Sequence, residues 1–150
     1  MTKAKSAPKH RLHTAELANE IEFLMARARA VGTAHANEVL AGLDLKARSY
    51  AVLSLAVGGA KPTQRELAEF LSLDASQIVA LVDVLQDRGL VAREPDPNDR
   101  RSNVIVSTDA GRELYSRASV LVAQAEARSL SALSDEERNQ LRILLSRVAL

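Results

Sequence analysis

The chain has 150 residues, 47% of them apolar, a net charge of +1 and no cysteine. This size suits one domain, or one domain with an appendage, and the lack of cysteine excludes disulfides, thiolate metal sites and cysteine nucleophiles. No apolar run reaches the about 18 residues that span a bilayer, and no signal-peptide core follows the basic first residues, so we expect a cytoplasmic protein.

Residues 1–12 contain four basic and no acidic side chains, which predicts a basic, flexible tail. The pair His10 and His13 has a spacing that can chelate a metal on a helix. No carboxylate cluster lies nearby in the sequence, so we assign the pair to the tail and expect no metal site or cofactor.

Residues 14–38 place apolar side chains at steps of three and four, the pattern of an amphipathic helix. The inner stripe consists of Leu17, Ile21, Leu24, Ala28, Val31 and His35. A second helix is predicted over 46–57, ended by the two glycines that follow it.

The next two helices are short and close together. A capping box of Thr63 with Glu66 opens the first, which runs to about Leu71. Asp74 caps the second, with Gln77 at the third position, and Gly89 ends it. Its inward side chains are Ile78, Leu81, Val82 and Leu85. Two short helices joined by a tight turn form a helix-turn-helix.

A hairpin follows. Residues 90–94 and 103–107 are predicted strands, with Val104 and Val106 alternating against Ile105. The intervening PDPNDRR at 95–101 contains prolines that exclude a regular strand, so it suits an exposed tip.

Two further amphipathic helices complete the chain. One carries Leu114, Ala118, Leu121, Val122 and Ala125. The other opens with a capping box of Ser134 and Glu137, and its apolar stripe is Leu141, Leu144, Leu145 and Val148. The long terminal helices must bury their stripes against one another or against a second copy. Phe23 and Phe70 are expected in the core.

These elements predict a mainly α fold with a small β wing, that is, a winged helix-turn-helix. Five runs then carry a resemblance to the MarR family: TQRELAE at 63–69, LDASQI at 73–78, LVDVLQDRGLV at 81–91, PDPNDRR at 95–101 and STDAGREL at 107–114. The wing run followed at a fixed distance by TDAGR is highly specific.

The resemblance implies a homodimer in which helices of 13–45 and 115–150 form a dimerisation bundle and 46–114 is the DNA-binding domain. Its two winged domains would read successive major grooves of a pseudo-palindromic operator on double-stranded DNA. Many members repress transcription, and a small phenolic or anionic effector releases them by entering the crevice between bundle and DNA-binding domain.

The resemblance also implies which residues contact DNA. Arg101 would enter the minor groove while Asp99 orients it or an adjacent arginine; Arg100 is a phosphate contact or simply solvated. Ser76 and Gln77 would touch bases, although Gln77 is equally explained as a cap. Thr63 and Gln64 lie where helix amides attract phosphate. The full predicted set is Thr63, Gln64, Ser76, Gln77, Val79, Ala80, Asp99, Arg100 and Arg101.

One feature departs from the family. The outer face of the second short helix carries Ala75, Val79, Ala80 and Val84 where relatives have polar or basic side chains, and residues 61–112 contain seven basic and nine acidic side chains. Aliphatic groups can contact thymine methyls but anchor no phosphates. Binding therefore relies on the wing and tail, or is weak, or Val79 and Val84 face protein in an inactive dimer.

For the effector crevice the candidates are His35, Arg48, Tyr50 and Tyr115; His35 is equally explained as a packed, hydrogen-bonded residue. No nucleophile with a base, carboxylate pair or metal cluster is recognisable, so we expect no enzyme. Aromatic residues, at 3%, are too few for a single-strand stacking platform. The main hypothesis is a repressor released by an effector. The alternative is a dimeric ligand-binding or protein-interaction module with weak or lost DNA binding.

Overall fold

Caps, glycines and apolar stripes determine where the helices begin and end in the computed structural model, which describes residues 11–150. Lys3, Lys5, Lys9 and His10, on which the predicted basic tail and the histidine pair depend, lie outside the described residues. The elements are the 3-10 helices η1 (Arg11–Thr14), η2 (Glu16–Asn19) and η3 (Ala41–Leu43), the helices α1 (Ile21–Leu40), α2 (Ala47–Val57), α3 (Gln64–Leu71), α4 (Ala75–Asp87), α5 (Asp109–Ser129) and α6 (Asp135–Ala149), and the strands β1 (Val91–Pro95) and β2 (Asn103–Ser107).

The first long helix begins later than its apolar pattern predicts. We expected it from Thr14, whereas residues 11–19 form two short 3-10 turns and α1 starts at Ile21. Glu20 has an extended backbone, with φ −77° and ψ 128°, which interrupts any continuous helix at this point. The periodicity was correct from Ile21 onward.

The predicted signals of the helix-turn-helix are confirmed. Thr63 accepts a hydrogen bond from the Glu66 backbone N–H, and Glu66 accepts one from the Thr63 backbone N–H. Ser72 has φ +52°, a left-handed conformation that ends α3 and separates it from α4. Gly89, with φ +69°, follows the last residues of α4 in the left-handed conformation that glycine adopts without steric cost.

The hairpin pairs β1 with β2 in antiparallel register from Val91↔Ser107 to Pro95↔Asn103. Pro95 therefore ends a strand instead of belonging only to the tip, because the last position of an edge strand needs no amide donor. The expected alternation along β2 is also wrong, since Val104 and Ile105 are both buried. The residues before α3 cover β2: Ile105 donates to the Pro62 carbonyl and Val104 bridges to Thr63.

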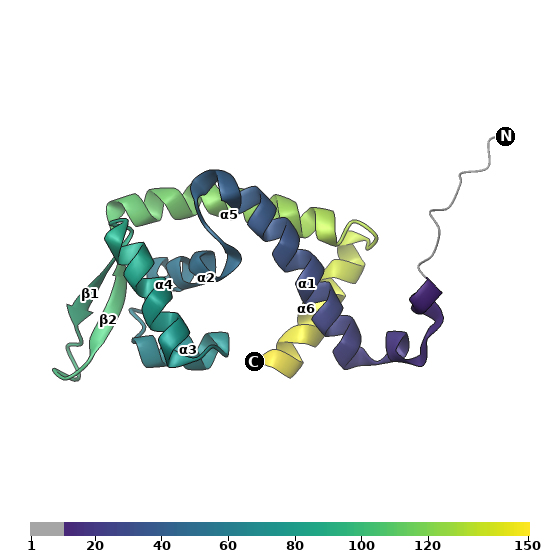
Figure 1. Ribbon diagram of the computed structural model, residues 1–150, viewed down its shortest axis with the longest axis horizontal. Helices are drawn as coiled ribbons and strands as arrows, with labels where there is room; N and C mark the ends of the chain where they lie inside the picture. Colours follow the sequence, from purple (N-terminus) through teal and green to yellow (C-terminus); the bar gives the residue numbers. More distant parts are fainter. Residues whose placement is uncertain (1–10) are drawn as a thin grey trace.

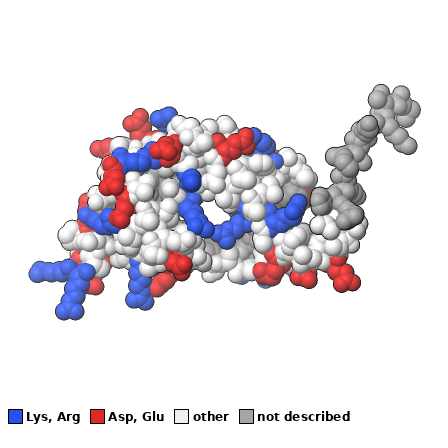
Figure 2. Space-filling view, in the orientation of Figure 1, with Lys and Arg blue, Asp and Glu red and all other residues white. Residues whose placement is uncertain are grey.

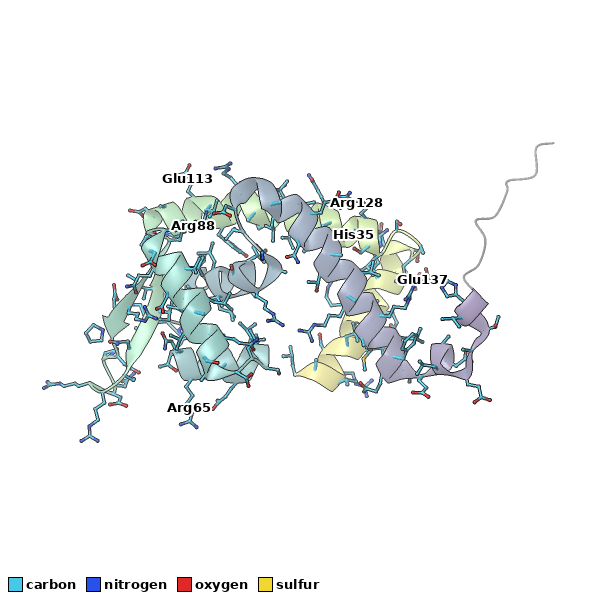
Figure 3. All side chains as sticks on the ribbon, viewed as in Figure 1. His35, Arg65, Arg88, Glu113, Arg128 and Glu137 are labelled. Atoms are coloured by element: carbon cyan, nitrogen blue, oxygen red, sulfur yellow. The ribbon has the colours of Figure 1, made fainter. Side chains whose placement is uncertain are left out.

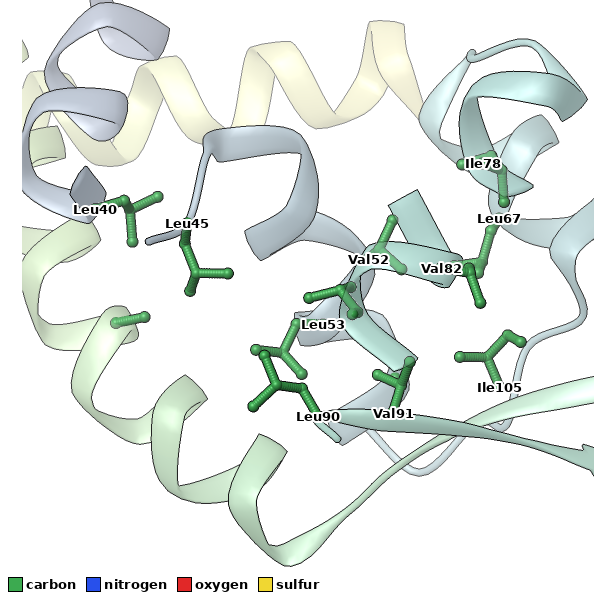
Figure 4. Close-up of a cluster of buried hydrophobic side chains, with 13 residues drawn as sticks. Leu40, Leu45, Val52, Leu53, Leu67, Ile78, Val82, Leu90, Val91 and Ile105 are labelled. Atoms are coloured by element: carbon green, nitrogen blue, oxygen red, sulfur yellow. The ribbon is translucent and has the colours of Figure 1, made fainter. Parts of the chain in front are cut away.

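One core holds α2, α3, α4 and the hairpin together (Figure 4). Its fully buried large side chains are Leu40, Val52, Leu53, Leu67, Ile78, Val82, Leu85, Val91 and Ile105. We call α2, α3, α4, β1 and β2 the winged unit. Phe70, expected in the core, is 63% exposed because it lies on the outer side of α3, whereas Phe23 is half-buried.

The remaining helices α1, α5 and α6 form the long-helix unit. Figure 1 shows α1 and α5 side by side, with α6 passing behind α1. The winged unit lies below one end of α5, and α1 and α6 extend below its other end. Helix α5 runs unbroken from the hairpin into the long-helix unit, across the predicted boundary at 114/115. No helix within residues 11–150 has the length and apolarity to cross a membrane.

The start of α5 is joined tightly to the winged unit. Thr108 caps α5 by accepting from the Gly111 N–H, and its hydroxyl donates to the Gly89 carbonyl over 2.6 Å. A Cβ on Gly111 would lie 2.0 Å from the Leu90 carbonyl oxygen, so only glycine allows this approach. The TDAGR run therefore acts as a structural joint between the two units.

Candidate nucleic-acid interface

Helix α4 lies beside the hairpin with one face open to solvent, and a groove of about 670 Å³ separates the start of α3 from the wing. Gln64, Arg65, Arg93 and Arg101 are among the residues that line this groove. Figure 2 shows basic side chains at the wing tip and below α3, and Figure 3 labels Arg65 at the second position. The two basic positions thus flank the groove on the same side of the molecule.

The wing tip is organised by the carboxylate of Asp99. This side chain accepts a hydrogen bond from the backbone N–H of Arg101 over 3.0 Å. Asp96 does the same for the N–H of Asn98 at 2.8 Å. Asp99 therefore positions Arg101 through its backbone and leaves the guanidinium to project, since Arg100 and Arg101 are both exposed.

The polar side chains at the start of α3 already have partners within the protein. The Thr63 hydroxyl donates to the Glu66 carboxylate over 2.9 Å, in addition to its capping bond. The backbone N–H of Thr63 and then its hydroxyl hold the pKa of Glu66 below the usual value. The hydroxyl of Thr63 is thus used by the cap, and the Gln64 side-chain oxygen accepts from Arg93.

The outer face of α4 is aliphatic, as the sequence predicted. Ala75, Ser76 and Ala80 are exposed, Val79 is 39% exposed and Val84 is 53% exposed. The side-chain oxygen of Gln77 accepts from the Asp74 N–H at 3.2 Å, which is the capping role that the spacing allowed. Its amide nitrogen lies at the exposed end of the helix, where a base contact is compatible with that role.

A cluster centred on Arg93 was not anticipated from the sequence. The guanidinium donates from Nε to Gln64 of α3, from Nη1 to Gln86 and from Nη2 to Asp83 of α4. The first two bonds measure 2.9 and 3.0 Å. We call Gln64, Asp83, Gln86 and Arg93 the Arg93 cluster. It fixes the wing to both helices, and no local pattern indicates it because its members are separated along the chain.

A second arginine, Arg88, ties the end of α4 to the long-helix unit. Its guanidinium donates to the carbonyls of Asp44 and Leu43, which follow α1 (Figure 3). The orientation of α4 is thereby linked to the segment between α1 and α2. Sequence reasoning had used this residue only as the end of a helix.

Of the four predicted effector residues, Arg48 alone lines the cleft between the two units. This cleft, of about 550 Å³, lies between α1, α2 and the α3–α4 turn, and Arg29 from α1 also lines it. Figure 2 shows basic side chains around the opening in the middle of the molecule. Arg29 was missed because its position on the first amphipathic pattern indicated only a solvated face.

The other three predicted effector residues pack elsewhere. Tyr50 and Tyr115 stack with ring centroids 5.7 Å apart, and the Ser54 hydroxyl lies 3.5 Å from the Tyr115 hydroxyl. Burial, and then the neighbouring Tyr115, raise the pKa of Tyr50 to about 12. His35 is half-buried, with Nδ1 2.6 Å from the Ser129 hydroxyl of α5. The four side chains therefore do not meet in one cavity.

Among residues 11–150, no three His, Asp or Glu side chains gather closely enough to hold a metal ion. The groove beside the wing is lined by arginines and carboxylates of α3 and the hairpin. The interface therefore offers a protruding helix, a protruding hairpin and flanking cations.

Comparisons with known proteins agree with this geometry. Residues 43–102 match the sequence profile of the MarR family. The multiple antibiotic resistance protein MarR of Escherichia coli is 33% identical over 113 residues, 75% of this chain and 78% of its own. Matches to regulators of Bacillus subtilis and Thauera aromatica cover 66% and 60% of those proteins.

Two crystal structures are similar over nearly the whole chain. A MarR-family transcriptional regulator from Rhodococcus sp. RHA1 superimposes with a TM-score of 0.86 at 38% identity, covering 91% of this chain and 97% of its own. CouR from Rhodococcus jostii RHA1, solved with p-coumaroyl-CoA, gives a TM-score of 0.81 at 39% identity, with 91% and 96% covered.

Proposed function

The chain belongs to the MarR family of transcriptional regulators, and we propose that it is a sequence-specific regulator that binds double-stranded DNA. The observation that carries the proposal is the exposed α4 beside a wing whose tip presents Arg101. A helix about 10–12 Å across fits a major groove about 12 Å wide. The members of this family are regulators and not enzymes.

The proposed contacts follow from where each side chain lies. The first turn of α4, with Ser76 and Gln77, enters the major groove together with Val79 and Ala80. Arg101, held by Asp99, enters the adjacent minor groove, where the potential is most negative. Arg100 and the start of α3, at Thr63 and Gln64, meet phosphates.

The protein acts as a homodimer in this proposal. An open apolar groove of about 1160 Å³ runs between α1, α5 and α6, and a second copy is its natural occupant. Ile21, Leu144 and Val148 line it while remaining 73%, 46% and 76% exposed in the single chain. Pairing through this face would set two α4 helices on one duplex about one helical turn apart, the spacing of a pseudo-palindromic operator.

The effector binds in the cleft that Arg29 and Arg48 line. Two guanidinium groups favour an anionic molecule, and the related CouR was solved with p-coumaroyl-CoA, an anionic thioester. Because Leu71 and Leu73 of the α3–α4 turn form one wall, an occupant pushes on the DNA-binding helices directly. The protein is thus a repressor that its effector releases, with His35, Tyr50 and Tyr115 in packing roles.

Titration of a duplex selected from a random library tests this function, with fluorescence anisotropy at two salt concentrations. We expect a Kd of about 10⁻⁸ M or tighter for the selected duplex, with log K falling linearly as log salt rises. Adding p-coumaroyl-CoA or salicylate as a probe should weaken binding. The variant Arg48→Ala should bind DNA as before but respond less to the probe.

A second function is supported by one observation: α4 contains no lysine or arginine, and residues 61–112 have more acidic than basic side chains. This favours a dimeric ligand-binding or protein-interaction module whose DNA binding is weak or lost. The same titration separates the two functions. A probe that binds the protein by calorimetry while no library duplex is enriched would support the module and contradict the regulator.

A further inference from the structure

The aliphatic face of α4 has a chemistry that selects particular bases. Five neighbouring exposed side chains on this helix are Ala75, Ser76, Val79, Ala80 and Val84, and only Ser76 is polar. Apart from Ser76, such a face cannot donate to or accept from the base edges of a groove. The bases opposite it must therefore offer apolar surface or lose hydrogen bonds to water without replacement.

Most polar side chains next to this face are committed to the protein, whereas Ser76 and Asp87 are exposed. Arg93 binds Gln64, Gln86 and Asp83 together, and it neutralises the one acidic group among them. Gln77 accepts from the Asp74 N–H. Gln64, Asp83 and Gln86 are thus held by the fold, which leaves the aliphatic groups between them as the exposed surface along the middle of α4.

Exposed arginines on the elements next to this face suit phosphates that flank the contacted bases. Arg65 borders the groove on the α3 side and Arg101 on the wing side, both exposed and both at its rim. The groove between these two arginines is lined by α3 and the wing, including the carboxylates Glu66, Glu69, Asp96 and Asp99, and the aliphatic face of α4 lies beside it, outside its lining.

From this juxtaposition we propose that Val79 and Ala80, with Val84 at the edge, read the 5-methyl groups of thymine, so that each operator half-site carries A·T pairs opposite the middle of α4. Thymine is the only standard base with an apolar group on its major-groove edge. The inference rests on the proposed function, and it specifies which base pairs of each half-site face α4.

The test uses the full-length protein and the library-selected duplex, with thymine replaced by deoxyuridine, which removes only the methyl group. Replacement at the positions facing α4 should weaken binding about fourfold per contacted methyl, and about 15-fold when both half-sites are changed. Deoxyuridine at flanking positions of the same duplex is the control, and it should leave the affinity unchanged.

A protein variant identifies which side chain contacts the thymine methyl group. Val79→Ala, an exposed change that leaves the core intact, should bind the thymine duplex more weakly and lose its sensitivity to deoxyuridine at one position in each half-site. Val120→Ala, an exposed valine on α5, should keep full sensitivity.

Two results would overturn the inference while leaving the proposed function in place. One is tight, specific binding that deoxyuridine does not alter, and the other is a selected half-site with G·C pairs facing α4. If no duplex is enriched and Val79→Ala instead changes the oligomeric state, α4 faces protein, and both the inference and the proposed function are wrong.

Discussion

The winged unit buries its apolar side chains within one chain, whereas the long-helix unit leaves many of its own in solvent. In α4, Ile78, Val82 and Leu85 are completely buried, but α6 buries no residue although its stripe contains three leucines. The difference teaches that the winged unit, with Leu40 of α1 and Ala118 of α5 packed into its core, finds cover for its apolar side chains within one chain. The long-helix unit leaves an apolar face that nothing in the single chain covers, and this is the face that the proposed dimer would bury.

The largest effect on DNA binding should follow from disrupting the exposed apolar face of the long-helix unit. Replacing Leu144 and Leu145 together by aspartate places charges in the open groove, where a partner's apolar side chains would otherwise pack. We expect a monomer by light scattering and operator binding weakened at least about 100-fold, because two linked half-site contacts become one.

Ser146→Asp, on the same helix but outside the groove lining, is the matched control and should remain dimeric. The winged unit of the double variant should stay folded by circular dichroism and thermal melting. A dimer that survives both aspartates would mean that another face joins the copies.

The next effect concerns the joint between the two units. In Gly111→Ala the new methyl would lie 2.0 Å from a backbone oxygen of Leu90, so the start of α5 must move away from the winged unit. We expect a loss of roughly 2 kcal/mol in the free energy of unfolding, measured by urea titration. Gly42→Ala, which has nothing within 4 Å, should change it little.

A smaller effect is expected at the wing tip, where only DNA binding should change. Arg101→Ala removes an exposed guanidinium and should weaken operator binding about tenfold without altering unfolding. Arg128→Ala, at the far end of α5, is the control (Figure 3). In the same assay Arg65→Ala should reduce the slope of log K against log salt by about two for a dimer. An unchanged affinity in Arg101→Ala would remove this residue from the interface.

The smallest effect is a pH dependence at the tyrosine stack, which joins α2 of one unit to α5 of the other. Burial raises the pKa of Tyr50 to about 12 from the usual tyrosine value of 10.0, so its neutral form is favoured by folding. The resulting stability is complete below pH 10 and is lost as the pH rises toward 12. Ultraviolet titration should show one tyrosine ionising late, and in Tyr115→Phe the late midpoint should move down. Two tyrosines that ionise together near pH 10 would contradict the stack.

The sequence predicted the local features of both units. Each capping box and the glycine after α4 have a signature within four residues, and each was confirmed. The wrong predictions arose where packing between distant segments decides the outcome. Val104 and Ile105 are both buried because the chain at Pro62 crosses β2. Phe70 is exposed although a large apolar side chain usually lies in a core.

The candidate interface divides in the same way. The exposed arginines at the tip follow from the wing motif, but the Arg93 cluster and the contacts of Arg88 join residues up to 45 positions apart. Arg29 faces the cleft only because α1 is placed over α2. A single glycine in the first turn of a helix was the one available signal for the Gly111 joint, since such a glycine usually has a packing reason.

The uninterrupted course of α5 has a mechanical consequence. Its 21 residues make a stiff rod about 31 Å long, joined to the wing at one end and packed against α1 at the other. A tilt of about 5° at the far end would swing the clamped hairpin by nearly 3 Å, with no flexible linker to absorb it. In the proposed dimer, such a rod would let a small repacking between the two subunits alter the reach of both hairpins at once.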